Sequence, residues 1–193
     1  MSELCAKRIR LANPSDAEGI LAIYAPIVLD TVISFELEPP TLQQMRERIA
    51  ATLPTLPWLI AESDQGIQGY AYASRHRERA AYQWSVDVSV YVAEGVRGKG
   101  LGRALYAPLL GILKDLGYYS ALAGIVLPNA ASVGLHEAMG FQPVGIYRRI
   151  GFKLGAWRDV GWWQCQLQDY ADNPTPPRHL ADRISVLTSW LPV

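Results

Sequence analysis

The stretch that decides the fold reads Arg97-Gly98-Lys99-Gly100-Leu101-Gly102-Arg103. A β-prone segment, 84–92, precedes it, and an apolar segment with helical spacing follows it as far as Gly117. A glycine-rich turn between a strand and a helix exposes backbone N–H groups at the positive end of the helix dipole. The glycines let the backbone approach a ligand, and the arginine and lysine side chains add positive charge. The stretch therefore predicts a pyrophosphate site rather than a plain tight turn.

The same residues exclude two other phosphate loops. A Walker A loop would close with Gly-Lys-Ser/Thr, which is missing here. A dinucleotide-binding fold would place the loop after its first strand, with an acidic residue at the end of the next strand. Here the loop follows the fourth predicted strand, and no such acidic residue follows it.

Hydrophobic periodicity predicts the elements around the loop. Strands are predicted at 9–12, 58–61, 69–73, 84–92, 121–127, 143–150 and 159–167. Helices are predicted after Ser15, after Thr41, from the glycine loop to Gly117, and at 129–139. This order predicts an α/β fold with one mixed sheet and helices on both of its faces.

Three local features refine this prediction. Ser15 and Glu18 have capping-box spacing, and Pro26 is expected to kink or end the first helix. Residues 31–35 are rich in β-formers. We expect one domain at 1–170 and a proline-rich C-terminal appendage at 171–193.

Composition and charge narrow the classes of partner. The chain has 193 residues, 50% of them apolar, and a formal net charge of zero, which gives nucleic-acid binding little support. No apolar run is long enough to span a membrane, and the N-terminal segment lacks the apolar run of a signal peptide. Cys5 and Cys165 form no CxxC pair and have no histidine at ligand spacing, so no metal site is predicted. We expect a cytoplasmic protein.

Several segments carry a family resemblance. Arg97-x-x-Gly100-x-Gly102 matches the Q/R-x-x-G-x-G/A signature of the GCN5-related N-acetyltransferases. The later segments resemble the phosphinothricin and methionine sulfoximine acetyltransferase subfamily: SVYV (89–92), LPNAAS (127–132), LHEAMGF (135–141) and GFKLGAWRDVGWWQ (151–164). The resemblance implies that fold, with a mostly antiparallel sheet and two splayed central strands. It also implies acetyl transfer from acetyl-CoA to the α-amino group of a small amino-acid-like substrate.

The resemblance also implies where the cosubstrate binds. Its pyrophosphate would lie on the glycine-rich loop, and its pantetheine arm would pair with the backbone of Val90, Tyr91 and Val92. Asn129 and Ser132, at the start of the next helix, would contact it as well. A plain helix cap explains Asn129 equally well from its position alone.

Asp87 is the first candidate for the proton acceptor. Strict alternation in 84–92 puts the valines on one face of the strand and the polar residues on the other. A carboxylate on an inner strand suggests a partly dry cavity, in which desolvation would raise its pKa. A structural ion pair is the alternative, and the resemblance places a longer glutamate at this position.

His136 is the second candidate. A histidine on a helix is usually a surface or core residue, but within LHEAMGF it aligns with an active-site histidine of the family. The sequence leaves open whether Asp87 or His136 accepts the proton.

The substrate contacts follow mainly from the resemblance. The charged loop 75–79 could simply be solvated, yet an arginine fork suits a substrate carboxylate. Lys153 lies in a segment that reaches a second subunit in relatives, which implies a homodimer. The full predicted set is Phe35, Arg77, Arg79, Tyr82, Asp87, Val88 and Lys153.

Two other functions stay open. The acceptor could be a different amine, such as a polyamine, an aminoglycoside or a protein N-terminus, although a neutral chain with an arginine-rich loop suits polycations poorly. The chain could also bind acetyl-CoA as a sensor without turnover.

Overall fold

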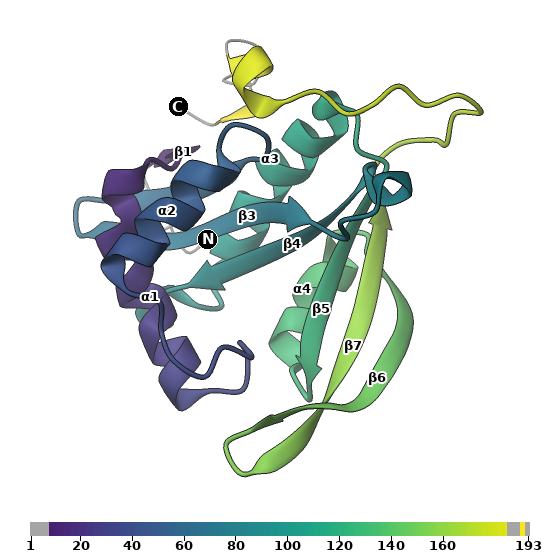
Figure 1. Cartoon of the computed structure of the whole chain (residues 1–193). Coiled ribbons are helices and arrows are strands. Elements are labelled where there is room, and N and C mark those ends of the chain that lie inside the picture. The colour runs from purple at the N-terminus through teal and green to yellow at the C-terminus, as the bar shows by residue number, and fades with distance from the viewer. Residues whose placement is uncertain (1–7, 185–189, 192–193) are drawn as a thin grey trace.

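A computed structural model describes residues 8–184, 190 and 191 (Figure 1). The helices are α1 (Ala17–Asp30), α2 (Leu42–Thr52), α3 (Leu101–Leu116) and α4 (Ala130–Ala138). The strands are β1 (Arg8–Leu11), β2 (Trp58–Ser63), β3 (Gly66–Arg75), β4 (Ser85–Val92), β5 (Ser120–Leu127), β6 (Gln142–Lys153) and β7 (Ala156–Gln166). They form one sheet in the order β1-β2-β3-β4-β5-β7-β6, antiparallel except between β4 and β5. The predicted order of elements and the mixed sheet are confirmed.

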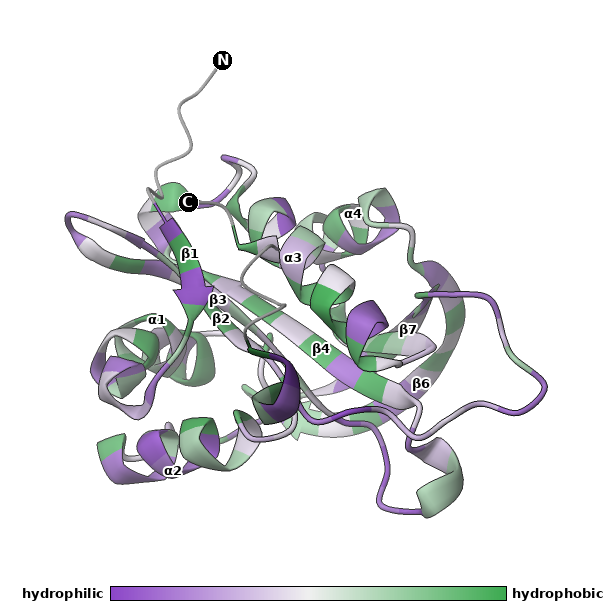
Figure 2. Ribbon diagram, turned by 90° about the horizontal axis from the view of Figure 1, so that it is seen from above, coloured by the Kyte–Doolittle hydropathy of each residue, from purple (hydrophilic) through white to green (hydrophobic). Residues whose placement is uncertain are grey.

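The helices cover both faces of the sheet, as predicted. Figure 2 shows α1 and α2 on one side of the strands and α3 and α4 on the other. One apolar cluster joins α1 and α2 to β2 and β3, with Ile20, Ile27 and Ile49 in its interior. A larger cluster joins α3 to the other face, where Val86 and Val88 of β4 lie. The alternation in β4 therefore separates an apolar face toward α3 from a polar face toward α1 and α2.

The central strands splay, and this is the feature that creates the site. β5 pairs with β4 at three positions only, the last being Asp87 with Leu122. Beyond that point β4 continues to Val92 beside β3, while β5 continues to Leu127 beside β7. The two strands diverge in the middle of the sheet because β4 stays hydrogen-bonded to β3 while β5 stays hydrogen-bonded to β7.

Of the two local predictions about the first helix, the capping box is wrong and the helix does not end at Pro26. The cap is Asn13, whose side chain accepts the Ser15 N–H at 2.9 Å while Asp16 accepts the Asn13 N–H at 2.8 Å. Ser15 and Glu18 therefore form no capping box. α1 runs through Pro26 to Asp30 because buried residues on both sides of the proline hold it against the sheet.

Residues 31–35 form no strand despite their composition. The Thr31 hydroxyl donates to the Ile27 carbonyl at 2.6 Å, and the Ser34 hydroxyl bonds the Tyr24 hydroxyl at 2.8 Å. These side chains finish α1 and tie the loop to it, so the β-forming residues have no neighbouring strand to pair with.

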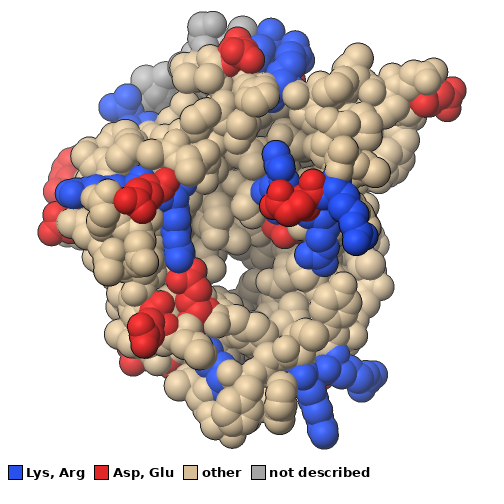
Figure 3. All heavy atoms as spheres, viewed as in Figure 1, with Lys and Arg blue, Asp and Glu red and all other residues tan. Residues whose placement is uncertain are grey.

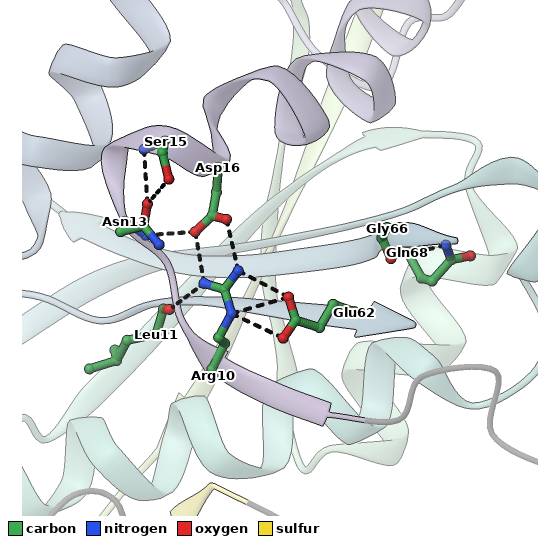
Figure 4. A network of polar contacts seen from close by, with 8 residues as sticks. All are labelled: Arg10, Leu11, Asn13, Ser15, Asp16, Glu62, Gly66 and Gln68. Carbon is green, nitrogen blue, oxygen red and sulfur yellow. Dashed lines mark hydrogen bonds and ion pairs between the residues drawn. The ribbon is translucent and has the colours of Figure 1, made fainter. Parts of the chain in front are cut away.

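Arg10 joins the first strand to its surroundings (Figure 4). Its guanidinium donates to both oxygens of Asp16 at 2.8 Å and, through Nε, to Glu62 of β2 at 3.1 Å. Burial raises the pKa of Asp16, but the bonds from Arg10 and from the Asn13 N–H outweigh it and hold that pKa below its ordinary value. This network fixes β1 and the turn that follows it to the rest of the sheet.

The segment after β7 folds back onto the domain. Leu180 is buried in the larger apolar cluster, and the Arg178 N–H donates to the Leu116 carbonyl at the end of α3. Trp190 donates from Nε1 to Asp115 at 2.6 Å. The described part of 171–193 thus packs against α3 and the turn before β2. Of the two cysteines, Cys165 is a free buried thiol and Cys5 lies outside the described residues.

Candidate active site

The diverging parts of β4 and β5 enclose a narrow cavity of about 60 Å³, the slot. Val88, Val90 and Tyr91 line it from β4, and α4 closes it with a polar wall. β4 bonds β3 along its other edge, so alternate backbone groups of β4 face the slot without a strand partner from β5. A chain that carries amide groups fits such an edge, because it can replace the missing strand.

The glycine-rich loop lies at the far end of β4. Gly98 and Gly100 have φ values of +75° and +83°, which other residues adopt only with strain. A Cβ at either position would project into open space, so the loop leaves room for a ligand close to its backbone. Gly100 caps α3 without a side-chain bond, and the N–H groups of the first turn therefore point outward unpaired by the helix. This geometry fits a pyrophosphate.

Gly102 and Leu101, at the start of α3, contribute to packing. A Cβ on Gly102 would lie 2.9 Å from Leu135 of α4, so this glycine allows the two helices to approach. The Leu101 side chain is buried in the α3 cluster and can offer a ligand only its backbone. Arg97 donates to the Val92 carbonyl and Lys99 to the Gly95 carbonyl, both at 3.1 Å, whereas Arg103 is exposed. The first two cations thus fold over the loop backbone.

Asp87 lies where the pairing of β4 with β5 ends, at the closed end of the slot. Its Oδ1 is 2.7 Å from Nδ1 of His76, the residue that follows β3. The His76 ring contacts Tyr82 and Trp162 edge-on, at centroid distances of 5.9 and 6.0 Å. Burial raises the pKa of Asp87, while the hydrogen bond from His76 and the charge of Arg77 oppose that rise. Asp87 and Tyr82 from the predicted set are thus brought together around His76.

His136 lines the slot but is fully engaged with its neighbours. It is 4% exposed, with Nδ1 at 2.7 Å from the Ser132 carbonyl and Nε2 at 3.0 Å from the Tyr106 hydroxyl. Because a carbonyl only accepts, Nδ1 carries the proton and Nε2 accepts from Tyr106. Burial lowers the pKa of His136. Asn129 caps α4 by accepting the Ser132 N–H at 3.1 Å, and it also lines the slot. Its position therefore fits both a helix cap and a contact to the cosubstrate.

The predicted arginines face a different cavity. Arg77 and Arg79 line a hollow of about 500 Å³ between α2, the loop after β3, and residues 177–179. Both side chains are exposed, and Asp87 does not line this hollow. Of the predicted substrate residues, Val88 lines the slot, these two arginines line the hollow, and the others line neither: Phe35, Tyr82, Asp87 and Lys153.

Phe35 and Lys153 meet where the loop after α1 reaches the β6–β7 hairpin. The Phe35 ring lies on Gly151, where a Cβ would be 2.2 Å from Cε2 of the ring. Lys153 is buried, and its ammonium donates to the carbonyls of Val28, Ser34 and Glu36 at 2.6–2.9 Å. Lys153 therefore supports the loop that carries Phe35. Figure 3 shows an opening through the molecule in this region, with charged side chains of both signs near its rim.

No sequence pattern pointed to three residues that lie at or near the candidate site: His76, Tyr106 and Trp162. His76 stands inside a charged loop and has no spacing that links it to Asp87 eleven residues later. The usable signal was strand register, because a short loop between paired strands returns the chain past the same position. In the described part of the chain, no cluster of three or more His, Cys, Asp or Glu could hold a metal ion, and no helix is long and apolar enough to cross a bilayer.

Comparison with known proteins agrees with this geometry. Residues 9–162 match the acetyltransferase (GNAT) domain family. The chain is 38% identical to a phosphinothricin N-acetyltransferase of Streptomyces viridochromogenes, over 88% of this chain and 91% of that protein. It is 33% identical to an L-methionine sulfoximine/L-methionine sulfone acetyltransferase of Salmonella typhimurium, over 84% and 96%. A crystal structure of a phosphinothricin acetyltransferase from Sinorhizobium meliloti in complex with acetyl-CoA superposes with a TM-score of 0.84 at 36% identity, over 89% and 94%.

Proposed function

The chain belongs to the GNAT acetyltransferase family, and from that premise we propose that it acetylates the α-amino group of a small amino acid analogue of the phosphinothricin or methionine sulfoximine type. Acetyl-CoA is the acetyl donor. The observation that carries the proposal is the splay after Asp87, which leads from a carboxylate to a glycine-rich helix start.

The cosubstrate would bind along the slot. Its pyrophosphate would accept hydrogen bonds from the N–H groups of residues 98–103, with Arg97, Lys99 and Arg103 supplying charge. Its amides would pair with the free edge of Val90, Tyr91 and Val92, beside Asn129 and Ser132. The thioester would then lie toward the closed end of the slot, close to Asp87.

The transfer is a direct displacement. An ammonium group must first lose a proton, because only the neutral amine has a lone pair to attack with. The amine nitrogen forms a bond to the acetyl carbon as the carbon–sulfur bond breaks, and the thiolate takes up the second proton from the nitrogen. A β4 backbone N–H at the slot can donate to the carbonyl oxygen as its charge grows.

Asp87 is the carboxylate of the proposed site, and His136 shapes the cosubstrate side. Asp87 keeps partial exposure, whereas both ring nitrogens of His136 already have partners. Asp87→Asn should lower kcat by about 10² to 10⁴ and leave acetyl-CoA affinity unchanged. His136→Ala is the matched variant, and a larger loss of kcat in it than in Asp87→Asn would reassign the proton acceptor to His136.

The deciding experiment measures acetyl-CoA consumption with a panel of acceptors. Phosphinothricin and methionine sulfoximine should give the highest kcat/KM, above polyamines, aminoglycosides and N-terminal peptides. Turnover of none of them, with tight acetyl-CoA binding, would support the sensor instead.

A homodimer is part of the proposal. β6 and the hairpin tip expose a band of large apolar side chains: Val144, Ile146, Tyr147, Ile150, Phe152, Leu154 and Trp157. Apolar bands of this kind mark interaction surfaces. Light scattering should give twice the mass of 21.3 kDa, and Ile146→Glu should convert the dimer to a monomer.

A free, buried Cys165 and the need for acetyl-CoA support a cytoplasmic location.

A further inference from the structure

The contact between His76 and Asp87 links two sites that the sequence keeps apart. His76 comes directly after β3, and Asp87 pairs with Ser74 across β3 and β4. The side chains are 12% and 29% exposed, and their 2.7 Å separation is that of a charge-assisted hydrogen bond. The pair is therefore partly buried beside the closed end of the slot, where Asp87 directly precedes the slot-lining Val88 and neither side chain of the pair lines the slot itself.

The chemistry of the two groups fixes where the proton of the ring lies. An ionised carboxylate can only accept, so Nδ1 of His76 carries a hydrogen and donates it to Asp87. In the neutral ring this leaves a lone pair on Nε2. Among the described residues, Nε2 of His76 has no hydrogen-bond partner. It is also absent from the fully buried side-chain atoms that lack a partner, so Nε2 is accessible. Tyr82 and Trp162 hold the ring edge-on and limit its rotation.

We infer that Nε2 of His76 is the atom that takes the proton from the substrate ammonium, with Asp87 orienting the ring and stabilising its protonated form. This inference rests on the proposed acetyl transfer. The ammonium N–H bond breaks and its proton passes to Nε2, so that the amine is left neutral and His76 becomes a cation beside the Asp87 anion. After the thiolate of CoA has taken the second proton, His76 releases the first to solvent.

Two comparisons within the chain favour His76. The lone pair of Nε2 in His136 is already occupied by the Tyr106 hydroxyl, so that ring has no free acceptor. Oδ1 of Asp87 already accepts from His76, whereas Nε2 of His76 has no partner among the described residues. The charged and titratable groups that face the pair are Arg77, whose cation favours the ionised Asp87, the Tyr82 phenol, and the Tyr72 phenol of β3, whose pKa the Asp87 charge helps to raise.

The test uses His76→Asn, because the asparagine amide can replace the Nδ1–H donor to Asp87 but offers nothing at the position of Nε2. His76→Asn should lower kcat about 10² to 10⁴-fold and leave acetyl-CoA affinity within twofold of the wild type. The loss should shrink as the pH rises toward the pKa of the substrate amine, since an amine that is already neutral needs no acceptor. The control is Gln43→Asn, a change between polar side chains at an exposed position of α2 that lines neither the slot nor the hollow.

Near-native kcat in His76→Asn would overturn the inference and leave Asp87 as the acceptor. A loss that stays constant with pH would also overturn it, because such a loss reports altered positioning. Nitrogen NMR shifts of the His76 ring give a readout that does not need turnover: the Nδ1–H form is expected, and an Nε2–H form overturns the inference. If the wild type acetylates no amino acid but these shifts show the Nδ1–H form, the proposed substrate class fails while the pair stands.

Discussion

Lys153 of β6 donates its ammonium to the backbone carbonyl of Ser34, 119 residues earlier, at 2.6 Å. Two more carbonyls of the same region, those of Val28 and Glu36, accept from the same group. One side chain thus joins the end of α1 and the loop after it to the β6–β7 hairpin. The joined elements come from the two sides of the splay, so the contact frames the opening from which an acceptor would approach.

Lys153→Met should loosen this frame. Methionine keeps most of the aliphatic volume but leaves three carbonyls without their donor, and the loop with Phe35 should lose its fixed position. We expect KM for the amino acid to rise about tenfold, with the acetyl-CoA dissociation constant unchanged. Arginine at the same position should restore part of the loss. Equal weakening of both ligands in Lys153→Met would instead indicate general destabilisation.

Gly151→Val tests the position of Phe35. The new side chain would occupy the space of the phenyl ring, which must then turn outward. KM for the acceptor should rise while acetyl-CoA binding holds. Gly145→Val is a matched control in the same strand, because a Cβ there meets nothing within 4 Å. Unchanged acceptor kinetics in a folded Gly151→Val variant would show that Phe35 is no wall of the substrate site.

Gly100→Val tests the phosphate loop. Valine is strained at a φ of +83°, and its branches would fill the space beside the exposed N–H groups. Acetyl-CoA should bind at least about tenfold more weakly in calorimetry, about 1.4 kcal/mol. Gly95→Val, in the same loop but without a positive φ, should bind normally. Native acetyl-CoA affinity in Gly100→Val would show that the pyrophosphate does not bind at this loop.

Arg77→Ala tests recognition of the substrate carboxylate. If the guanidinium binds that group, KM should rise far more for an amino acid than for its carboxamide. Arg46→Ala, at an exposed position of α2, serves as the charge-matched control. Equal changes for acid and amide would make Arg77 a surface charge only.

Arg10→Met tests the anchor of the first strand. Its loss leaves Asp16 and Glu62 without their shared cation, and we expect about 2 kcal/mol of destabilisation in urea unfolding. A lowered Asp16 pKa adds stability that is full above the ordinary value of about 3.9 and is lost as the pH falls toward the folded value. The acid loss of stability should therefore be less steep in Arg10→Met. An unchanged pH dependence would mean that Arg10 does not set the Asp16 pKa.

The sequence predicts most elements because their signals are local. The glycine-rich loop carries its own turn chemistry, and the alternation in β4 fixes which residues share a face. Residues 31–35 are rich in β-formers yet form no strand, because the hydroxyls of Thr31 and Ser34 bond residues of α1. The pairs that frame the candidate site, such as Lys153 with Ser34, join residues far apart in sequence. No period or spacing encodes such pairs, since they depend on how whole elements pack.

The splay leaves an unpaired strand edge in the interior of the sheet, and this has a consequence for how long the protein survives. A molecule that completes the edge binds the folded chain only, so it shifts the unfolding equilibrium by mass action. At a hundredfold excess over its dissociation constant, acetyl-CoA would add about 2.7 kcal/mol of stability. Cells rich in acetyl-CoA should therefore protect this chain from proteolysis, and its abundance should follow their metabolic state.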